Sequence, residues 1–298
     1  MDSAATAVYL VIGHEDDPCC REVAAVLRGR GARVVATPEP LAGEAVFSWA
    51  LGAGRSSCSL RLADGTVIER EALGGVLVRA QGGPYDAEGW GAADLGYART
   101  ETAAALVAWL WDLSCPVVNR LTPDLWFRFQ RPLVDWWPLL RRHGVPAAGA
   151  LITRDAAGAR GYAERWGGAA LYAPLTAGAR YRVASEDEWA ELGRLMARVP
   201  VCLLEPPAGP ALYACVAGEA VVWDRPGALS GEERGALGAG LRALAGELGL
   251  GTLEAELRRV AGGVRCYGLG LYPRLERYDE AGRAVLARAL TGLLGVAG

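Results

Sequence analysis

One run of ligand-type side chains follows the first expected strand of this sequence. His14, Glu15, Asp16 and Asp17 come directly after the apolar segment Val8 to Gly13. Strand ends of this kind often face the ligand site of an α/β protein, so the run could bind a metal ion. The same residues also suit a solvated loop, in which Asp17 caps a helix that begins at Pro18. The residues leave both interpretations open.

Arginines offer a second kind of chemistry, the recognition of anions. Arg79 ends the apolar strand Gly75 to Arg79, and Tyr97 and Glu101 share one face of the helix that follows. These three side chains could line a groove for a peptide or substrate, or Arg79 and Glu101 could form an internal ion pair. Arg274 and Arg277 follow a later strand, where they could hold an anion or lie in a surface turn.

Thiol and imidazole chemistry has little support. The seven cysteines include no CxxC pair, and there are only two histidines, which argues against a zinc site. Neither histidine lies in a motif typical of a Ser-His-Asp site. Cys19 and Cys20 could form a redox pair, but packing of a helix against a sheet explains them as well. The odd count and apolar neighbours of the cysteines indicate a reducing, cytoplasmic environment.

The charge of the chain limits its partners. The net charge is −3, which gives no support for binding nucleic acid or an anionic membrane. The N-terminus has no basic segment of a signal peptide, and no apolar run reaches the ~20 residues of a membrane helix. All 31 basic residues are arginine, so the chain is free of lysine and of any chemistry that needs an ammonium group.

The first half of the chain predicts a parallel sheet. Two apolar strands, Val8 to Gly13 and Ala32 to Ala36, flank a helix that starts at Asp17-Pro18. Alternation around Asp64-Gly65 predicts a hairpin over Cys58 to Arg70. A long helix over Ala92 to Leu113 and a short strand over Pro116 to Asn119 follow.

The segment from Thr122 to Gly144 favours helices interrupted by prolines. Leu133, Trp136, Trp137 and Leu140 form an apolar stripe, which is typical of core packing rather than of base stacking. Pro138 is expected to kink or restart this helix.

The second half alternates strands and helices. Capping boxes at Ser185 to Glu188 and Ser230 to Glu233 predict two helix starts. A final helix is expected from about Asp279 to Leu294. Six segments are expected to form strands: Ala150 to Thr153, Ala170 to Pro174, Leu212 to Val216, Ala220 to Trp223, Leu253 to Arg259 and Val264 to Gly270.

Several phrases in this order resemble the ATP-grasp superfamily, especially RimK-like and microviridin-type peptide ligases. The phrases are LADGTVIEREALGGVLVR from Leu62, YARTE from Tyr97, CPVVNRLTP from Cys115, RRHGVPAAGALITRD from Arg141, and YACVAGEAVV from Tyr213. The resemblance covers nearly the whole chain.

The resemblance implies a mixed α/β and α+β fold. An N-terminal α/β domain over residues 1–118 would precede an ATP-grasp-like module over residues 119–298. The module would have a small lobe at about 145–205 and a C-terminal lobe at about 206–298. A peptide or a partner protein, such as an active ligase or another modifying enzyme, and a homodimer are also implied.

The positions that bind nucleotide in this family are altered. Arg131 stands for the first lysine and Ala173 for the second, and the loop Thr176 to Arg182 keeps one glycine where the family has a glycine-rich phosphate loop. Glu205 remains at the adenine hinge, and Tyr213 replaces an arginine that contacts phosphate. Arg131 and Arg182 could still bind phosphate, because guanidinium groups pair well with oxyanions.

The positions that bind Mg²⁺ in this family are also altered. Aligned on Pro273, the stretch CYGLGLYPRL has Gly270 at the place of a glutamate and Tyr272 at the place of an asparagine. Glu256 could match a third acidic ligand, but one carboxylate makes a poor Mg²⁺ site. The stretch is therefore interpreted as a vacated metal site.

These losses favour a catalytically degenerate protein with no cofactor, a binding or accessory protein for peptide or natural-product modification. It remains open whether the chain is an enzyme. The alternative is an active ATP- and Mg²⁺-dependent carboxylate–amine ligase that forms an acyl phosphate and uses arginines in place of lysines. A third hypothesis is a repurposed cleft with a chemistry that does not use ATP.

Overall fold

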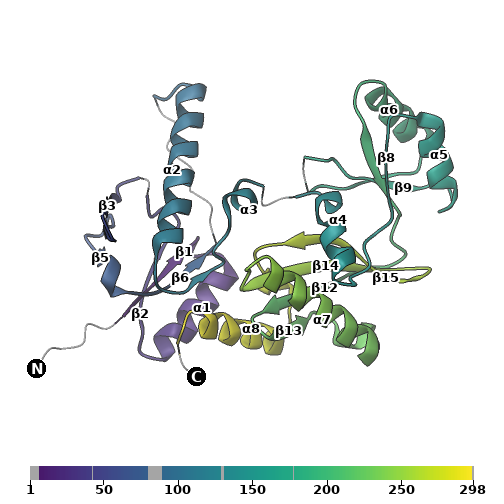
Figure 1. Ribbon diagram of the computed structural model, residues 1–298. Coiled ribbons are helices and arrows are strands. Elements are labelled where there is room, and N and C mark those ends of the chain that lie inside the picture. Colours follow the sequence, from purple (N-terminus) through teal and green to yellow (C-terminus); the bar gives the residue numbers. More distant parts are fainter. Residues whose placement is uncertain (1–6, 42, 80–88, 129–130, 177, 297–298) are drawn as a thin grey trace, which may run out of the picture.

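A computed structural model describes residues 7–41, 43–79, 89–128, 131–176 and 178–296. Its strands form four sheets, and helices cover them on several sides (Figure 1). Ala177, within the loop predicted to contact phosphate, lies outside the described residues. No helix of the described part is long and apolar enough to cross a membrane.

The N-terminal sheet is parallel, as the β-α-β pattern predicts. Its strand order is β2-β1-β6-β7, and β1 pairs in parallel with both β2 and β6. Asp17 caps helix α1 by accepting a hydrogen bond from the Cys19 amide, with Pro18 in the first turn. The elements are β1 (Val8–Ile12), α1 (Pro18–Gly29), β2 (Arg33–Thr37), β6 (Leu73–Val78) and β7 (Val117–Val118).

A small antiparallel sheet and a long helix accompany this first sheet. The hairpin around Asp64-Gly65 is confirmed, and an additional strand pairs with its first arm. The N-terminal half of α2 is largely exposed and projects from the body (Figure 1). These elements are β3 (Val46–Gly52), β4 (Arg55–Arg61), β5 (Val67–Glu69) and α2 (Ala92–Asp112).

The segment between α2 and the small lobe contains two short helices, α3 (Pro123–Phe127) and α4 (Leu133–Arg142). Helix α4 runs through Pro138, so the predicted restart is wrong and the interruption lies before Leu133. Trp136 is fully buried, whereas Trp137 is 37% exposed, so the core assignment is wrong for Trp137. Trp137 lies beside the buried stripe, and the Arg141 guanidinium packs over its ring.

The small lobe has a sheet and a core of its own. Its strand order is β10-β9-β11-β8, and α5 and α6 supply buried side chains such as Tyr162 and Trp189. The capping box at Ser185 is present and begins α6. The elements are β8 (Ala150–Thr153), α5 (Ala156–Glu164), β9 (Ala170–Tyr172), β10 (Tyr181–Val183), α6 (Glu186–Met196) and β11 (Val201–Leu204).

The C-terminal sheet is antiparallel, with the order β13-β12-β14-β15. Helix α7 packs on it after the second predicted capping box, and α8 lies beside α1 (Figure 1). The elements are β12 (Ala211–Ala217), β13 (Ala220–Trp223), α7 (Gly231–Glu247), β14 (Thr252–Val260), β15 (Gly263–Gly270) and α8 (Glu280–Leu293). The division into domains at residue 118 stays a prediction.

Backbone hydrogen bonds join the small lobe to the C-terminal sheet. Cys266 donates to the Pro146 carbonyl and accepts from the Ala148 amide, while the Tyr267 hydroxyl donates to the Glu205 carbonyl. We call these contacts of residues 146–149 and 205 the hinge. The hinge holds the middle of β15, at Cys266 and Tyr267, beside the small lobe, and the C-terminal end of β15 leads into the candidate site.

Candidate functional site

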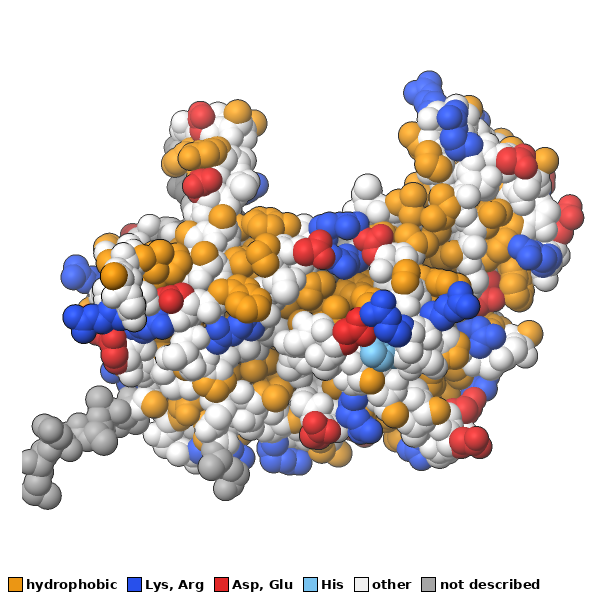
Figure 2. Space-filling model, viewed as in Figure 1, with side chains coloured by type: hydrophobic (Ala, Val, Ile, Leu, Met, Phe, Trp, Pro, Cys, Tyr) orange, Lys and Arg blue, Asp and Glu red, His pale blue; other side chains and the backbone are white. Residues whose placement is uncertain are grey.

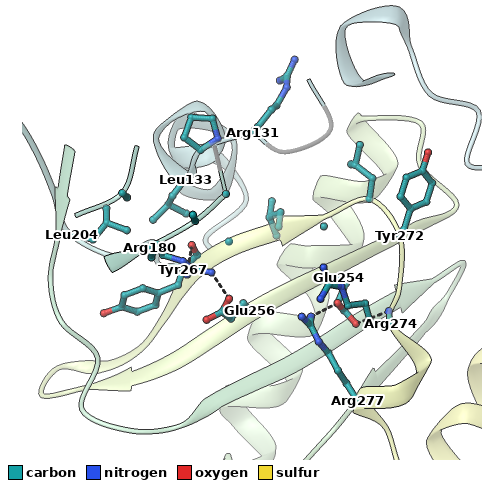
Figure 3. A pocket seen from close by; sticks show the side chains of 18 of the residues that line it. Arg131, Leu133, Arg180, Leu204, Glu254, Glu256, Tyr267, Tyr272, Arg274 and Arg277 are labelled. Atoms are coloured by element: carbon teal, nitrogen blue, oxygen red, sulfur yellow. Dashed lines mark hydrogen bonds and ion pairs between the residues drawn. The ribbon is translucent and has the colours of Figure 1, made fainter. Parts of the chain in front are cut away.

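A cavity of about 420 Å³ lies where the N-terminal sheet, α4, the small lobe and the C-terminal sheet meet. We call it the cleft. Its size is in the range typical of small-molecule sites. Figure 3 shows its labelled side chains above strands β14 and β15, and Figure 2 shows the open valley between α2 and the small lobe. The charged residues that line the cleft are five arginines and two glutamates: Arg79, Arg131, Arg180, Arg274, Arg277, Glu254 and Glu256.

Strand alternation directs the two glutamates to the same side. Glu254 and Glu256 are two positions apart on β14, so their side chains leave the same face of the sheet. In the register with β15, Glu254 lies opposite Gly270 and Glu256 lies opposite Gly268. The two glycines have no side chains, and the glutamates and their arginine partners therefore dominate this face of the cleft.

Glu254 is held by a complete set of donors. One carboxylate oxygen accepts hydrogen bonds from the Arg274 amide and the Tyr278 hydroxyl, both at 3.1 Å, and the other accepts from Arg277. The side chain is only 4% exposed. Burial raises its pKa, because the attraction of Arg277 and the other donors only partly offsets the loss of solvation. Arg277 in turn lies 3.8 Å above the centroid of the Tyr213 ring.

Glu256 connects the C-terminal sheet to the small lobe. Arg180, from the segment before β10, donates to one of its oxygens and to the Tyr267 carbonyl at 3.0 Å. Arg258 donates to the other oxygen at 2.8 Å. Burial disfavours the charged carboxylate, but the two arginines outweigh this effect and lower its pKa.

Arg79 reaches the cleft from the end of β6. Asp17 accepts a hydrogen bond from its Nε at 2.9 Å and forms an ion pair with its Nη2 at 2.8 Å. Nη1 is buried and has no hydrogen-bond partner among the described residues. A Cβ at Gly13 would come within 2.9 Å of the Arg79 side chain, so glycine gives Arg79 room. The guanidinium lies 5.5 Å from the ring centroid of Tyr272.

Arg131 and Arg274 complete the cationic lining. Arg131 pairs with Asp124 and lies 5.3 Å from the Trp136 ring centroid, while its Nε is buried without a hydrogen-bond partner among the described residues. The Arg274 side chain is exposed. Glu254 accepts a hydrogen bond from the backbone amide of Arg274 and not from its guanidinium. Arg274 therefore keeps an exposed guanidinium at the cleft, whereas Arg131 is already paired.

The structure separates some of the residues singled out from the sequence. Tyr97 and Glu101 lie on the exposed half of α2, and neither lines the cleft with Arg79. The ion-pair partner of Arg79 is Asp17 instead of Glu101. Arg182 lines a different cavity, on the face of β10 and α6, while its neighbour Arg180 enters the cleft.

The remaining candidate positions lie in or near the cleft. Arg131 and Arg274 line it, as do Ala173, Gly270 and Tyr272 at positions altered from the resemblance. Glu205 lies at the hinge, where it accepts a hydrogen bond from the Gly149 amide at 3.1 Å. Tyr213 lies beneath Arg277.

The other motifs have structural roles. Asp17 caps α1 and pairs with Arg79, and no group of three or more potential metal ligands occurs within the described ranges. Cys19 and Cys20 are free thiols on the buried face of α1, and burial raises the pKa of each to about 12. Such thiols are poor nucleophiles, which favours the packing interpretation.

Sequence reasoning missed Arg180 and Glu254. The sequence does carry a signal for Glu254. It lies two positions before Glu256 on the same strand, and a strand that turns one of these side chains to the cleft turns both. Arg180 has no such signal: it precedes β10, and only the approach of the small lobe to β14 brings it to Glu256.

Comparison with solved structures identifies the fold. The chain superposes on a RiPP-associated ATP-grasp ligase of Chryseobacterium gregarium, in complex with ADP and a leader and core peptide, at a TM-score of 0.75 and 13% identity. The match covers 97% of this chain and 96% of the other. The chain has the ATP-grasp fold. This confirms the fold class expected from the sequence.

Two further structures with this fold agree over nearly full length. Macrocyclase MdnC bound with precursor peptide MdnA, from Microcystis aeruginosa MRC, gives a TM-score of 0.76 at 14% identity, with 97% of this chain and 99% of the other covered. ATP-grasp ligase PsnB, complexed with precursor peptide PsnA2 and AMPPNP, gives 0.73 at 21% identity, with 99% of each chain covered. No protein-family model and no curated protein matches the sequence.

ATP-grasp ligase PsnB has been solved with Mg and ADP, but the carboxylates of this cleft do not fit a magnesium ion. Both oxygens of Glu254 and both oxygens of Glu256 already accept hydrogen bonds, and each glutamate is paired with at least one arginine. Gly270 and Tyr272 add no carboxylate or amide oxygen. Mg²⁺ requires hard oxygen ligands in a near-octahedral arrangement, and here it would have to displace arginines that are already bound.

Proposed function

We propose that this protein is a catalytically degenerate ATP-grasp protein, a binding or accessory protein in the modification of a peptide or natural product. One observation carries the proposal: each carboxylate of the cleft is neutralised by an arginine of the same chain. Phosphoryl activation of a carboxylate depends on metal ions that neutralise developing charge between phosphate oxygens. A cleft without free acidic ligands has no place to hold such ions.

A peptide is the partner that the structural comparisons favour. Three of the superposed ATP-grasp structures are complexes with a leader and core peptide or with a precursor peptide. The free state of all seven cysteines is consistent with a reducing compartment such as the cytoplasm. The partner would therefore be a peptide, or a modifying enzyme that acts on one, in the same compartment. A homodimer is a further arrangement that we propose from the resemblance.

The competing function is an active ATP-dependent ligase that uses arginines in place of lysines. Arg131 favours it, because this arginine lines the cleft at the position where the sequence resemblance expects a lysine. A third candidate, chemistry without ATP in a repurposed cleft, has no specific residue in its favour.

Calorimetry with ATP and ADP, with and without Mg²⁺, separates the first two functions. Binding tighter than roughly 100 μM, about −5.5 kcal/mol, that is strengthened by Mg²⁺ would contradict the degenerate cleft, as would release of ADP in the presence of a peptide. The proposed function expects neither. Selection from a displayed peptide library, followed by fluorescence anisotropy on the enriched sequences, tests the peptide partner.

A further inference from the structure

The small antiparallel sheet ends in a strand whose outer edge is open. Strand β3 is last in the order β3-β4-β5 and pairs with β4 in an unbroken register from Val46 to Gly52. Within the described ranges, no backbone hydrogen bond reaches β3 from outside this sheet. A row of unpaired amide and carbonyl groups is a template on which another strand can pair. The edge of β3 is therefore a candidate site for the addition of a strand.

Proteins usually protect such an edge, and β3 lacks the usual protection. Its sequence VFSWALG contains no charged residue and no proline, and its register with β4 contains no bulge. With seven residues it is the longest uncharged edge strand of the described part of the chain, since β8 and β13 have four each. Helix α8 packs against β13. Figure 1 shows β3 on the side of α2 that faces away from the small lobe.

The side chains of β3 are complementary to a copy of the same strand turned through 180°. Phe47, Trp49 and Leu51 leave the same face, because strand side chains alternate. The Phe47 ring packs edge-on against Trp109 of α2, whereas Leu51, near the other end of the strand, is 70% exposed. An antiparallel pair centred on Trp49 gives all seven residues a partner and places Leu51 directly opposite Phe47 of the second copy. Each exposed leucine would then cover a phenylalanine across the strand pair.

The charges that flank β3 are complementary in the same register. Glu44 precedes the strand and Arg55 follows the turn that ends it, and both side chains are exposed. In the pair centred on Trp49, residue 44 of one copy lies opposite residue 54 of the other, so Glu44 comes next to Arg55 of that copy. A two-fold axis repeats every contact, so the arrangement has one such ion pair at each end. An uncharged strand with an acid before it and a base after it therefore favours its own copy over an unrelated strand.

We propose that two copies of this chain pair through β3 in antiparallel orientation and form one continuous sheet, with three strands from each copy. The proposal rests on the homodimer in the proposed function and gives it a surface and a register. No residue of β3 lines the cleft, so the pairing does not involve the cleft. At ~3.4 Å per residue, the seven paired residues span about 24 Å. The interface is narrow and belongs to the small, weak class.

Sedimentation equilibrium of the purified protein, at about 1 to 100 μM to bracket a micromolar dissociation constant, tests the dimer. We expect the mass to rise from that of one 31.4 kDa chain to that of two. Leu51→Lys should raise the dissociation constant about tenfold or more, because a charge would face Phe47 of the other copy. The melting temperature should not change, since Leu51 is exposed. Val67→Lys is the matched control: Val67 is 44% exposed on β5, at the opposite edge of the same sheet, and this variant should dimerise like wild type.

Cross-linking with cysteine variants tests the register. Ser48 and Ala50 are exposed, and the pair centred on Trp49 places Ser48 of one copy opposite Ala50 of the other. Directly opposite residues have Cβ atoms roughly 4.5–5.5 Å apart, whereas diagonal neighbours are about 7–8 Å apart, too far for a disulfide. Under mild oxidation with copper phenanthroline, a one-to-one mixture of Ser48→Cys and Ala50→Cys should form a disulfide-linked dimer. Either variant alone should not.

Three results would overturn the proposal: a monomer over the whole concentration range, a dimer that Leu51→Lys leaves intact, or equal cross-linking by the single cysteine variants and by their mixture. A monomer whose Leu51→Lys variant loses the peptides enriched from the displayed library would also overturn it, and would assign the edge to a peptide strand. None of these results concerns the cleft. The degenerate cleft fails only on Mg²⁺-strengthened nucleotide binding or on ATP turnover, so the two failures are distinguishable.

Discussion

At the scale of residues, the two glutamates of the cleft have opposite electrostatic environments. Glu254 is more deeply buried, and its pKa is raised by the loss of solvation. Glu256 is held between Arg180 and Arg258, which outweigh burial and lower its pKa. The two side chains leave the same strand two positions apart, so they form a matched pair for a test of pH dependence.

We predict that the two glutamine variants respond to pH in opposite directions. A raised pKa means that Glu254 contributes stability at low pH that is lost as pH rises through its raised pKa. Glu254→Gln should therefore be as stable as wild type or more stable at neutral pH, and similar to wild type in acid. A lowered pKa means that Glu256 contributes stability above the ordinary glutamate pKa that is lost as pH falls through its lowered pKa. Glu256→Gln should lower the free energy of unfolding by about 1–3 kcal/mol at neutral pH.

The measurement is the free energy of unfolding of both variants in urea, taken between pH 4 and pH 8. This is roughly the range over which glutamates change charge. Parallel stability curves for the two variants would contradict the assigned environments. The pairings with Arg180 and Arg277 were not foreseeable, because these partners come from other parts of the chain, whereas Arg258 lies two positions from Glu256 on the same strand.

At the scale of elements, caps and turns were predictable and close packing was not. Both capping boxes, the Asp17-Pro18 helix start and the hairpin at Asp64-Gly65 follow from local chemistry and are present. Strand β3 was missed, because its sequence VFSWALG has no regular alternation of polar and apolar residues, although its burial alternates in the structure. The structure excludes the restart at Pro138, since α4 continues past it with Trp136 and Leu140 buried in the core; the kink stays a prediction.

Helix α7 offers a prediction about packing. A Cβ at Gly240 would lie 2.5 Å from the His143 carbonyl oxygen and 2.7 Å from Val145, whereas a Cβ at Gly235 meets nothing within 4 Å. Gly240→Ala should therefore destabilise the protein by about 1–3 kcal/mol. Gly235→Ala, on an exposed position of the same helix, should stabilise it by about 0.5–1 kcal/mol, because alanine favours the helix.

Thermal unfolding of the two variants checks this prediction. Equal shifts of the melting temperature in the same direction would contradict the close approach of α7 to the end of α4.

At the scale of the whole molecule, contacts within the described residues hold the small lobe to the C-terminal sheet at two places. The first is the hinge, with its hydrogen bonds between residues 146–149, 205, 266 and 267. The second is Arg180, which reaches across to Glu256 and to the Tyr267 carbonyl. With both in place, the cleft is fixed at two sides.

We predict that Arg180→Ala loosens the small lobe while the hinge remains. The free energy of unfolding should fall by about 1–3 kcal/mol, because Glu256 loses one charged hydrogen-bond donor. Hydrogen exchange of β9 and β10 amides should become faster, since local opening would no longer break the ion pair. Arg182→Ala is the control, because Arg182 is exposed and lines another cavity. Unchanged exchange in Arg180→Ala would show that the hinge alone orders the lobe.

The sequence by itself determined the fold class, through its resemblance to ATP-grasp ligases, and most element boundaries, which follow from local information such as period and capping residues. The loss of the metal site at Gly270 and Tyr272 stays a prediction. Only the tertiary structure decided which arginine enters the cleft, which carboxylates are already paired, and that Tyr97 and Glu101 lie away from Arg79. The reason is physical. Charge pairs in this cleft join residues up to 76 positions apart, and their distances depend on how the lobes pack, which no local pattern encodes.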